Sequence, residues 1–282
     1  MDWQKISTLD RRWLYLCLFI VVAWQTMFPL KVQNVVSPMS AGLFDYLNSL
    51  NEGDFIVIQS DWTMSTQGES QGQFQSLIKL LARKKIRFVV TSVSDPACPD
   101  IAKANIKMVL EKEPGGKDFK ENEFWAVAGY FPNAENHNTN MVNNIRQELR
   151  AKGVTTLPVM NGIDDLSDTK AVVVVTGTSS ALLWYERMNN KTQLGMMLTA
   201  VMAGENIPYY LSRQSFGLVI GAKGAYDMET KLAEAFPDPK FPNYDNGKRF
   251  MSPLAFALFL LIFAVIVGNV AGKLARKQSE QQ

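Results

Sequence analysis

The sequence predicts an α/β fold: a Rossmann-like, doubly wound, mostly parallel sheet, flanked by N- and C-terminal transmembrane helices. Two observations carry this prediction. In the middle of the chain, short and continuously apolar segments alternate with amphipathic helical segments, a pattern typical of parallel strands covered on both faces. Each end of the chain contains a long apolar segment without a charged residue. Of the 282 residues, 47% are hydrophobic and 20% are charged, which excludes a disordered chain.

The first apolar segment, residues 14–30, reads LYLCLFIVVAWQTMFPL. A bilayer core requires about 20 apolar residues, within a range of about 17 to 25, so this segment is short for a transmembrane helix but sufficient. The alternative is a cleaved signal peptide, because Lys5, Arg11 and Arg12 precede the segment. No small-residue cleavage site follows it, so we expect an uncleaved anchor.

The second apolar segment, residues 250–271, reads FMSPLAFALFLLIFAVIVGNVA and is followed by a basic tail. Its length predicts a second transmembrane helix and disfavours the alternative, a buried core helix. Two spans place both termini on one side of the membrane. Because three basic residues precede the first span and only Lys31 follows it closely, the positive-inside rule predicts cytoplasmic termini and an extracytoplasmic domain. A cytoplasmic domain is the alternative, and it suits Cys98, the single cysteine of that domain.

The predicted organisation has six parts. They are an N-terminal segment (1–13), transmembrane helix 1 (14–30), an α/β domain (31–236), a linker rich in Pro, Asn and charge (237–249), transmembrane helix 2 (250–271) and a basic tail (272–282). The whole chain has a net charge of +2. Six of its 29 basic and three of its 27 acidic residues lie outside 31–249, so that region has a net charge of -1. This charge disfavours nucleic acid as a partner and leaves the lipid bilayer and other protein subunits.

Strands and helices alternate through the first half of the domain. We expect an amphipathic helix at 38–50 and, after Gly53-Asp54, a strand at 55–58. Apolar residues recur at helical spacing between Phe74 and Leu81 and predict the next helix. The elements that follow are a strand at 86–93, a helix at 99–110, a strand at 124–128 and a helix at 138–151.

The second half of the domain begins with the clearest strand, 171–176, whose sequence AVVVVT is continuously β-branched at its centre. A helix is predicted at 179–188, and 193–203 is interpreted as another helix. Short apolar segments at 207–211 and 216–220 are candidates for either type of element. The last helix of the domain spans 224–236, because Pro237 and Pro239 end it.

The sequence motifs of common enzyme classes are absent. The chain contains no G-x-G-x-x-G, no Walker-type phosphate loop, no G-x-S-x-G, no H-E-x-x-H and no C-x-x-C. His137 is the only histidine and lies in a polar segment, for which we expect a surface loop. Two cysteines cannot build a disulfide framework. We therefore expect no cofactor, no metal site and no assignable catalytic residue, which disfavours an enzyme.

Polar segments follow three of the predicted strands, where open α/β sheets bind their ligands. The candidate ligand-binding residues are Ser60, Asp61 and Trp62 after the first strand, Ser94 and Asp95 after the second, and Thr178, Ser179 and Ser180 after 171–176. Hydroxyl groups at the start of a helix could bind an anion, although helix capping explains the same residues. The pair Asp61-Trp62 could form a ligand platform or a packed corner.

A segment of small residues near the last helix is a candidate interface, carried by Gly221, Lys223, Gly224 and Tyr226. Two other interpretations are a nest of backbone N–H groups beside Lys223 and tight packing between a strand and a helix. Four acidic residues surround a Gly-Gly loop, and we expect them to form a solvated face; they are Glu111, Glu113, Glu121 and Glu123.

Several short motifs occur in a fixed order along nearly the whole chain. They are LDRRW at 9–13, VSP at 36–38, GD at 53–54, LPVMNGI at 157–163, GAKGAYDME at 221–229 and GN at 268–269. In this order the chain resembles an uncharacterised family of bacterial membrane proteins with an α/β domain between two transmembrane helices. The resemblance implies this architecture and a bacterial inner-membrane location, and it implies no activity.

Two main functional hypotheses follow. The first is a membrane-anchored, non-enzymatic α/β domain that acts as a structural or assembly subunit of an oligomeric membrane complex, either a homo-oligomer or a complex with other membrane proteins. The alternative is a ligand-binding sensor domain with its pocket at the strand carboxyl ends. A hydrolase or transferase that uses Asp61 or Asp95 with Ser179 is less favoured, because fold alone does not imply function.

Overall fold

A computed structural model describes residues 10–30, 32–188 and 190–279 of the chain. It divides the chain into two compact units: residues 34–247 form an α/β unit, and residues 1–33 together with 248–282 form the other. The N-terminal segment 1–13 is thus described only from Asp10, and the basic tail only to Ser279. Lys5 and Lys31, two of the charges that predict the topology, lie outside the described residues.

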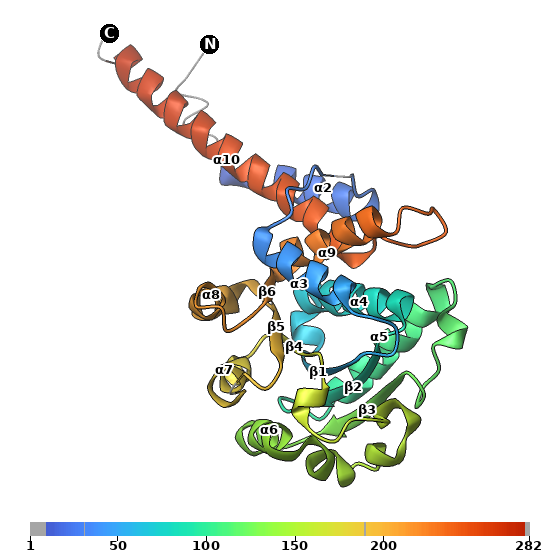
Figure 1. Cartoon of the computed structure of the whole chain (residues 1–282). Coiled ribbons are helices and arrows are strands. Elements are labelled where there is room, and N and C mark those ends of the chain that lie inside the picture. The colour runs from blue at the N-terminus through green and yellow to red at the C-terminus, as the bar shows by residue number, and fades with distance from the viewer. Residues whose placement is uncertain (1–9, 31, 189, 280–282) are drawn as a thin grey trace. The chain divides into compact units, whose positions relative to one another are not determined.

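The α/β unit is built on one six-stranded, all-parallel sheet, which confirms the predicted α/β class (Figure 1). Its strands are β1 (Phe55–Asp61), β2 (Arg87–Ser92), β3 (Trp125–Tyr130), β4 (Ala171–Thr176), β5 (Gln193–Leu198) and β6 (Gly217–Ile220). Their order across the sheet is β3-β2-β1-β4-β5-β6. The order reverses between β1 and β4, an arrangement consistent with a Rossmann-like, doubly wound sheet.

Helices cover both faces of the sheet, and each face has its own hydrophobic core. The helices against one face are α3 (Pro38–Ser49), α4 (Gln67–Lys84), α5 (Cys98–Lys112) and α9 (Gly221–Ala235); those against the other are α6 (Ala134–Arg150), α7 (Leu182–Arg187) and α8 (Ala203–Leu211). Along β1, Ile56 and Ile58 enter the first core, whereas Phe55 and Val57 enter the second. Burial on both faces explains why the strands are continuously apolar.

The prediction of a helix at 193–203 is wrong. Residues Gln193–Leu198 form strand β5, which lies between β4 and β6 and is buried from its second residue onward. The short apolar segment at 207–211 belongs to helix α8, and that at 216–220 contains strand β6. A short apolar segment buried on every side has no amphipathic periodicity, so periodicity alone does not distinguish the two types of element.

Helix α6 differs from the predicted helix 138–151 in two ways. It begins at Ala134, where the side chain of Asn133 accepts a hydrogen bond from the Asn136 N–H at 2.9 Å. It is also interrupted at Asn144, whose backbone is extended (φ -160°, ψ 91°). The Asn144 side chain accepts a hydrogen bond from the Gln147 N–H at 2.8 Å, as an N-cap residue does. Asn144 thus ends one helical segment and starts the next.

The two ends of the α/β unit lie side by side on helix α9. At the incoming end, the Asn34 amide donates to Asp227 Oδ1 and to Thr230 Oγ1, both at 2.9 Å. At the outgoing end, the Gly247 N–H donates to Glu229 Oε1 at 2.7 Å. The residues of α9 that receive the two ends are therefore neighbours in sequence.

The segment predicted as a linker, 237–249, packs on the α/β unit up to Gly247. The Pro242 carbonyl accepts a hydrogen bond from Lys79 Nζ at 2.7 Å, and Asn246 donates to Gln75 Oε1 at 2.8 Å. Arg83 donates to Asn243 Oδ1 at 2.6 Å. All three partners lie on α4, so this segment is fixed to the fold rather than extended from it.

Helix α3 lies against the edge strand β6 at unusually short range. A Cβ atom added to Gly217 would overlap the backbone of Leu43, so only glycine allows this approach. The Ser40 hydroxyl also donates to the Leu218 carbonyl at 3.4 Å. Helix α3 thereby covers an edge that would otherwise expose backbone hydrogen-bonding groups.

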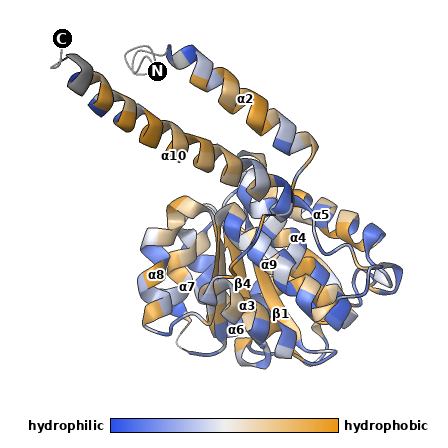
Figure 2. Cartoon of the chain, turned by 90° about the horizontal axis from the view of Figure 1, so that it is seen from above, coloured by the Kyte–Doolittle hydropathy of each residue, from blue (hydrophilic) through white to orange (hydrophobic). Residues whose placement is uncertain are grey.

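The second unit contains the two apolar helices, α2 (Arg11–Met27) and α10 (Asn246–Ser279), both of which are hydrophobic over most of their length (Figure 2). In the described part of the chain, α10 is the one helix long and apolar enough to cross a membrane. Helix α2 is also apolar, but with 17 residues it is too short to be counted as such a helix. Between the helices, the Ser252 hydroxyl donates to Gln25 Oε1 at 2.9 Å, and both side chains are buried.

Candidate functional site

The sequence-predicted site residues gather at the carboxyl ends of the central strands. Asp61 is the last residue of β1, and β1 lies between β2 and β4. Ser94 follows β2, and the segment Thr178–Ser180 follows β4. This is the edge where the strand order reverses, which is the usual ligand site of a doubly wound sheet. The question is therefore whether these groups face a ligand or one another.

The Asp61 carboxylate is 1% exposed and fully occupied by hydrogen bonds from within the chain. Oδ1 accepts from the Ser92 hydroxyl at 3.0 Å and from the backbone N–H groups of Val93 at 2.7 Å and Ser94 at 3.2 Å. Oδ2 accepts from Gln59 Nε2 at 2.6 Å and from the Ser180 hydroxyl at 3.4 Å. A carboxylate offers about four lone-pair positions, so five donors leave none for a ligand.

Gln59 links this carboxylate to helix α7, which covers the same face of the sheet. While its amide nitrogen donates to Asp61, its carbonyl Oε1 accepts a hydrogen bond from Trp184 Nε1 at 2.7 Å. Trp184 lies on α7 and is fully buried. Gln59, a partner of Asp61, and Trp184, a partner of Gln59, were not among the predicted site residues. Gln59 directly follows the apolar residues of β1, and a polar side chain at a buried strand position indicates a hydrogen-bonded partner.

Three hydroxyl groups extend the network from β4. Thr176 Oγ1 lies 3.0 Å from Thr178 Oγ1, which lies 2.8 Å from the Ser180 hydroxyl, and Ser180 reaches Asp61. Ser179 lies beside this chain and is exposed. The predicted helix start is a 3-10 turn, η6 (Ser179–Ala181), followed by the six-residue helix α7. Thr178 makes no side-chain cap hydrogen bond there, so capping does not explain it either.

Ser94 and Asp95 serve the turn between β2 and α5. Asp95 Oδ1 accepts the Ala97 N–H at 2.7 Å, which fixes the turn before α5. The Ser94 hydroxyl lies 3.5 Å from Cys98 Sγ. Burial raises the pKa of the Cys98 thiol, and hydrogen bonds from Ser94 and Ser92 offset this only in part. The thiol is therefore neutral at pH 7 and is not an activated nucleophile.

Trp62 and Ser60 belong to the other face of the sheet. Trp62 is 1% exposed, and its ring centroid lies 5.9 Å from that of Phe74 on α4. Ser60 is fully buried beneath the same layer. The pair Asp61-Trp62 thus forms a packed corner in which the two side chains enter opposite cores.

The residues of the candidate interface lie in contacts within the chain. Gly221 starts α9 directly after β6 with a positive φ of 61°, and Gly224 packs closely on Val219. Lys223 pairs with Asp227 and donates to the Val35 carbonyl at 2.9 Å. Tyr226 is 2% exposed and lies 6.1 Å from the ring of Tyr244. These residues join α9 to β6 and to the two ends of the α/β unit.

The prediction of a surface loop around His137 is wrong. His137 lies on α6, is 1% exposed and stacks on Phe131 with 4.0 Å between ring centroids. Its Nδ1 lies 2.8 Å from Glu148 Oε1. Burial lowers the pKa of His137, and the nearby carboxylate of Glu148 offsets this only in part. Several apolar residues of α6 point to the sheet, and they carry the neighbouring His137 inward with them.

The predicted solvated acidic face is also wrong at one position. Glu113 is buried and accepts two hydrogen bonds from Arg83, at 2.8 Å from Nε and 2.9 Å from Nη2. Glu111 and Glu123 are exposed, whereas Glu121 is half-buried and lies 2.5 Å from Lys103 Nζ. Among the residues that the structure describes, no group of three or more His, Cys, Asp or Glu side chains could hold a metal ion.

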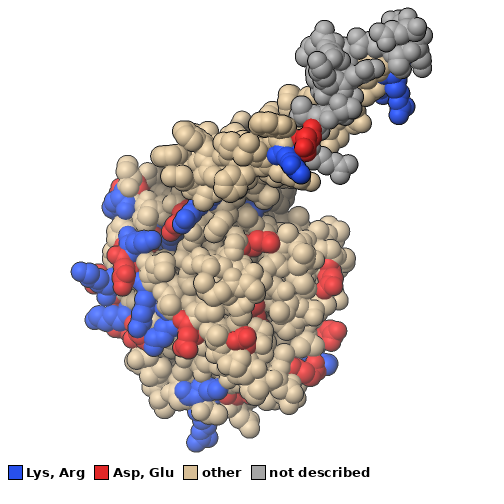
Figure 3. Space-filling model, turned by 180° about the vertical axis from the view of Figure 1, so that it is seen from behind, with Lys and Arg blue, Asp and Glu red and all other residues tan. Residues whose placement is uncertain are grey.

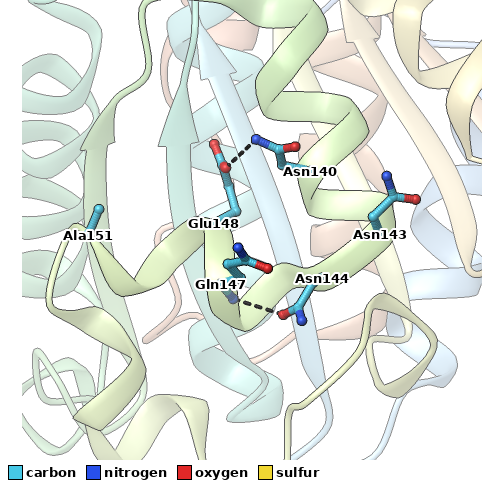
Figure 4. A pocket seen from close by; sticks show the side chains of 6 residues that line it. All are labelled: Asn140, Asn143, Asn144, Gln147, Glu148 and Ala151. Atoms are coloured by element: carbon cyan, nitrogen blue, oxygen red, sulfur yellow. Dashed lines mark hydrogen bonds between the residues drawn. The ribbon is translucent and has the colours of Figure 1, made fainter.

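A hollow of ≈ 280 Å³ lies beside the interruption of α6 (Figure 4). Asn140, Asn143, Asn144, Gln147, Glu148 and Ala151 line it. The Glu148 carboxylate accepts a hydrogen bond from the Asn140 amide at 2.8 Å in addition to its contact with His137. The hollow is polar, and its one charged group is held by two partners.

The loops at the carboxyl edge of the sheet contain few charged residues, and the Glu69 carboxylate on α4 also reaches this edge, where it accepts a hydrogen bond from the Ala200 N–H at 2.7 Å. The segments that follow the first five strands, residues 62–66, 93–97, 131–133, 177–181 and 199–202, contain one charged residue, the half-buried Asp95. Two large apolar side chains are exposed there, Met64 at 65% and Val201 at 82%. Figure 3 shows a face of the molecule on which Lys and Arg gather along one side and the middle carries few charges.

Comparison with known proteins adds no assignment to this geometry. No protein-family model matches the chain, and no curated protein matches it.

Proposed function

We propose that this protein is a membrane-anchored, non-enzymatic α/β domain that acts as a structural or assembly subunit of an oligomeric membrane complex. One observation carries the proposal: the Asp61 carboxylate and the hydroxyl groups around it are occupied by one another, and the large apolar side chains of Met64 and Val201 are exposed at the same edge of the sheet. Such a surface suits contact with another protein better than recognition of a polar small molecule.

An enzymatic role has little support from the same groups. Asp61 has no free lone pair, Asp95 fixes a turn and Cys98 is a neutral buried thiol. A general base must reach the proton that it abstracts, and a buried carboxylate with five donors does not. The hydroxyl of Ser179 is exposed, but it is Ser180 that contacts Asp61.

Helix α10 supports the membrane anchor, and α2 is proposed as a second, shorter span. A hydrogen bond between Ser252 and Gln25 joins buried side chains of the two helices. Polar side chains inside a bilayer need such partners, because lipid tails provide none. The basic residues before α2 favour cytoplasmic termini and an extracytoplasmic α/β domain in a bacterial inner membrane.

The first and last segments of the α/β unit are both attached to its own helices. Buried Asp227 and Glu229 hold the incoming and outgoing segments, and Lys79 and Arg83 on α4 hold the residues just before α10. A domain held in this way has little freedom at its ends.

The test compares two charge insertions in the full-length chain, purified in mild detergent. Val201→Glu replaces an exposed apolar side chain at the carboxyl edge of the sheet with a charge, whereas Leu211→Glu does so at a similarly exposed site, 72%, at the end of α8. Native mass spectrometry should show a complex for the unaltered chain and for Leu211→Glu, and its loss for Val201→Glu. If the unaltered chain is monomeric in this measurement and has no partner, the proposal is contradicted.

A further inference from the structure

Glu148 joins the two segments of the interrupted helix α6. Helix α6 is broken at Asn144, so His137 and Asn140 belong to its first segment and Glu148 to its second. Glu148 Oε1 lies 2.8 Å from His137 Nδ1, and Oε2 accepts from the Asn140 amide at the same distance. The two contacts span 11 and 8 residues, separations that a straight helix does not bring together. Figure 4 shows the Asn140 contact beside the hollow at the break.

The buried ring of His137 is only half satisfied. Because a carboxylate only accepts hydrogen bonds, Nδ1 carries the proton in the neutral ring and Nε2 is an acceptor. Nε2 is buried and has no hydrogen-bond partner among the described residues. The amide of the adjacent Asn138, which is fully buried, also has no hydrogen-bond partner in that part of the chain. The first segment of α6 therefore buries polar groups that make no hydrogen bond in the folded chain and would make hydrogen bonds to water if the segment opened.

Three charged groups face the His137 ring, and they oppose one another. Glu148 on α6 and Asp61 at the end of β1 favour the protonated ring, whereas Lys152 beyond α6 disfavours it. Phe131 covers one face of the ring and contributes to its burial. Burial is the largest effect, so the pKa of His137 in the folded chain lies below its ordinary value of 6.5. A protonated ring would place a second N–H group, on Nε2, where no acceptor lies.

We propose that the contact between His137 and Glu148 is a pH-dependent switch: when His137 is protonated, the first segment of α6 moves away from the sheet, with Asn144 as the hinge. The movement brings both ring nitrogens and the Asn138 amide to water. It also exposes the part of the second hydrophobic core that Met141 and Val142 of the first segment of α6 fill. The inference does not depend on the assembly proposal, because the contact between His137 and Glu148 lies within one helix of a single chain.

The direction of the pH effect follows from the lowered pKa. A group whose pKa is lower in the closed state binds its proton more readily in the open state. The stability that neutral His137 gives to the closed state is complete above about pH 6.5 and decreases as pH falls through the folded pKa. Between pH 6.5 and the pKa of His137 in the folded chain, the equilibrium constant for opening should rise about ten-fold for each unit by which the pH is lowered.

Hydrogen exchange of the full-length chain in mild detergent measures this opening. Exchange rates of amides at residues 134–143, corrected for intrinsic pH dependence, should rise about ten-fold per pH unit below 6.5, while those of β1 stay constant. His137→Asn retains a donor near the position of Nδ1 and cannot be protonated, so its rates should be independent of pH. An unchanged pH response in His137→Asn would overturn the inference.

Glu148→Gln provides a second, opposite test. It removes the charge that favours the protonated ring, so the folded pKa of His137 should fall further and the acid response should extend to lower pH. Because His137 is the only histidine, one ring resonance in a preparation without a histidine tag reports its pKa directly by NMR. A pKa of 6.5 or above in the unaltered chain would refute the switch even if the variants fail to fold.

Discussion

At the scale of single residues, the buried carboxylate of Asp61 is the centre of the site, and its role is structural. Its oxygens receive donors from β1, β2 and the segment after β4, so it fixes three strand ends relative to one another. In a ligand-binding or catalytic interpretation, removal of its charge would change activity and leave stability intact. If the role is structural, as this geometry indicates, removal of the charge should lower the stability of the fold.

We therefore expect Asp61→Asn to destabilise the fold. If the Asn oxygen replaces Oδ1, its amide nitrogen faces Gln59 Nε2, and two donors then oppose each other with no acceptor between them. A buried polar group left without a partner costs about 1–3 kcal/mol. Denaturant unfolding monitored by tryptophan fluorescence should show this loss. Asp95→Asn, which alters a single local hydrogen bond, is the control and should cost less than about 1 kcal/mol. Equal stability of Asp61→Asn and the unaltered chain would return Asp61 to the list of functional candidates.

A second residue-scale prediction concerns the ion pair between Arg83 and Glu113. The side chains are 2% and 1% exposed, so each charge depends on the other. Glu113→Ala leaves the guanidinium buried and unpaired, and we expect a loss of about 3–5 kcal/mol in the free energy of unfolding. Glu121→Ala is the control, because Glu121 and its partner Lys103 are 32% and 40% exposed. It should cost less than about 1 kcal/mol in the free energy of unfolding. Urea denaturation of both variants measures the difference, and similar values would refute it.

Residue identity alone predicted where these groups lie but not what they contact. The prediction placed Asp61, Ser94 and Ser180 at one edge, because carboxyl ends of parallel strands share an edge. It did not predict that Gln59 bridges Asp61 and Trp184, because the bridge joins residues separated by 125 positions. It also treated Glu113 as solvated, because its partner lies on another helix.

At the scale of elements, the predictions succeeded where the sequence is amphipathic or continuously β-branched. Helix α3 and strand β4 lie where they were expected, and α4 contains the predicted segment from Phe74 to Leu81 but begins earlier, at Gln67. Strand β5 was interpreted as a helix, because its residues QLGMML combine good helix formers with complete burial. The interruption of α6 at Asn144 was not predicted either, since a polar run such as NNIRQE shows no break in its periodicity.

The packing of α3 on β6 gives an element-scale prediction. Gly217→Ala would place a methyl group against the backbone of Leu43, which has no rotamer to change, so the helix must shift. We expect a loss of about 1–3 kcal/mol. Gly204→Ala on α8 meets no neighbouring atom within 4 Å and should be neutral or stabilising by up to about 1 kcal/mol. Thermal unfolding of the two variants in parallel measures the contrast. A stable Gly217→Ala variant would show that α3 is less closely fixed than the geometry indicates.

At the scale of the whole molecule, the side of the membrane on which the α/β unit lies is the most informative unknown. Native Cys98 is fully buried and cannot report accessibility, and Cys17 lies on α2. Both are replaced by serine, and a new cysteine is introduced either at Leu211, which is 72% exposed and is the control site of the assembly test, or at Lys273, an exposed position of α10. The proposed topology predicts that a membrane-impermeant maleimide labels Leu211→Cys in intact cells, whose outer membrane it passes. Lys273→Cys should be labelled only after the inner membrane is permeabilised, because the termini are cytoplasmic in that topology. The reverse pattern would place the domain in the cytoplasm, and labelling of both positions in intact cells would rule out a two-span hairpin.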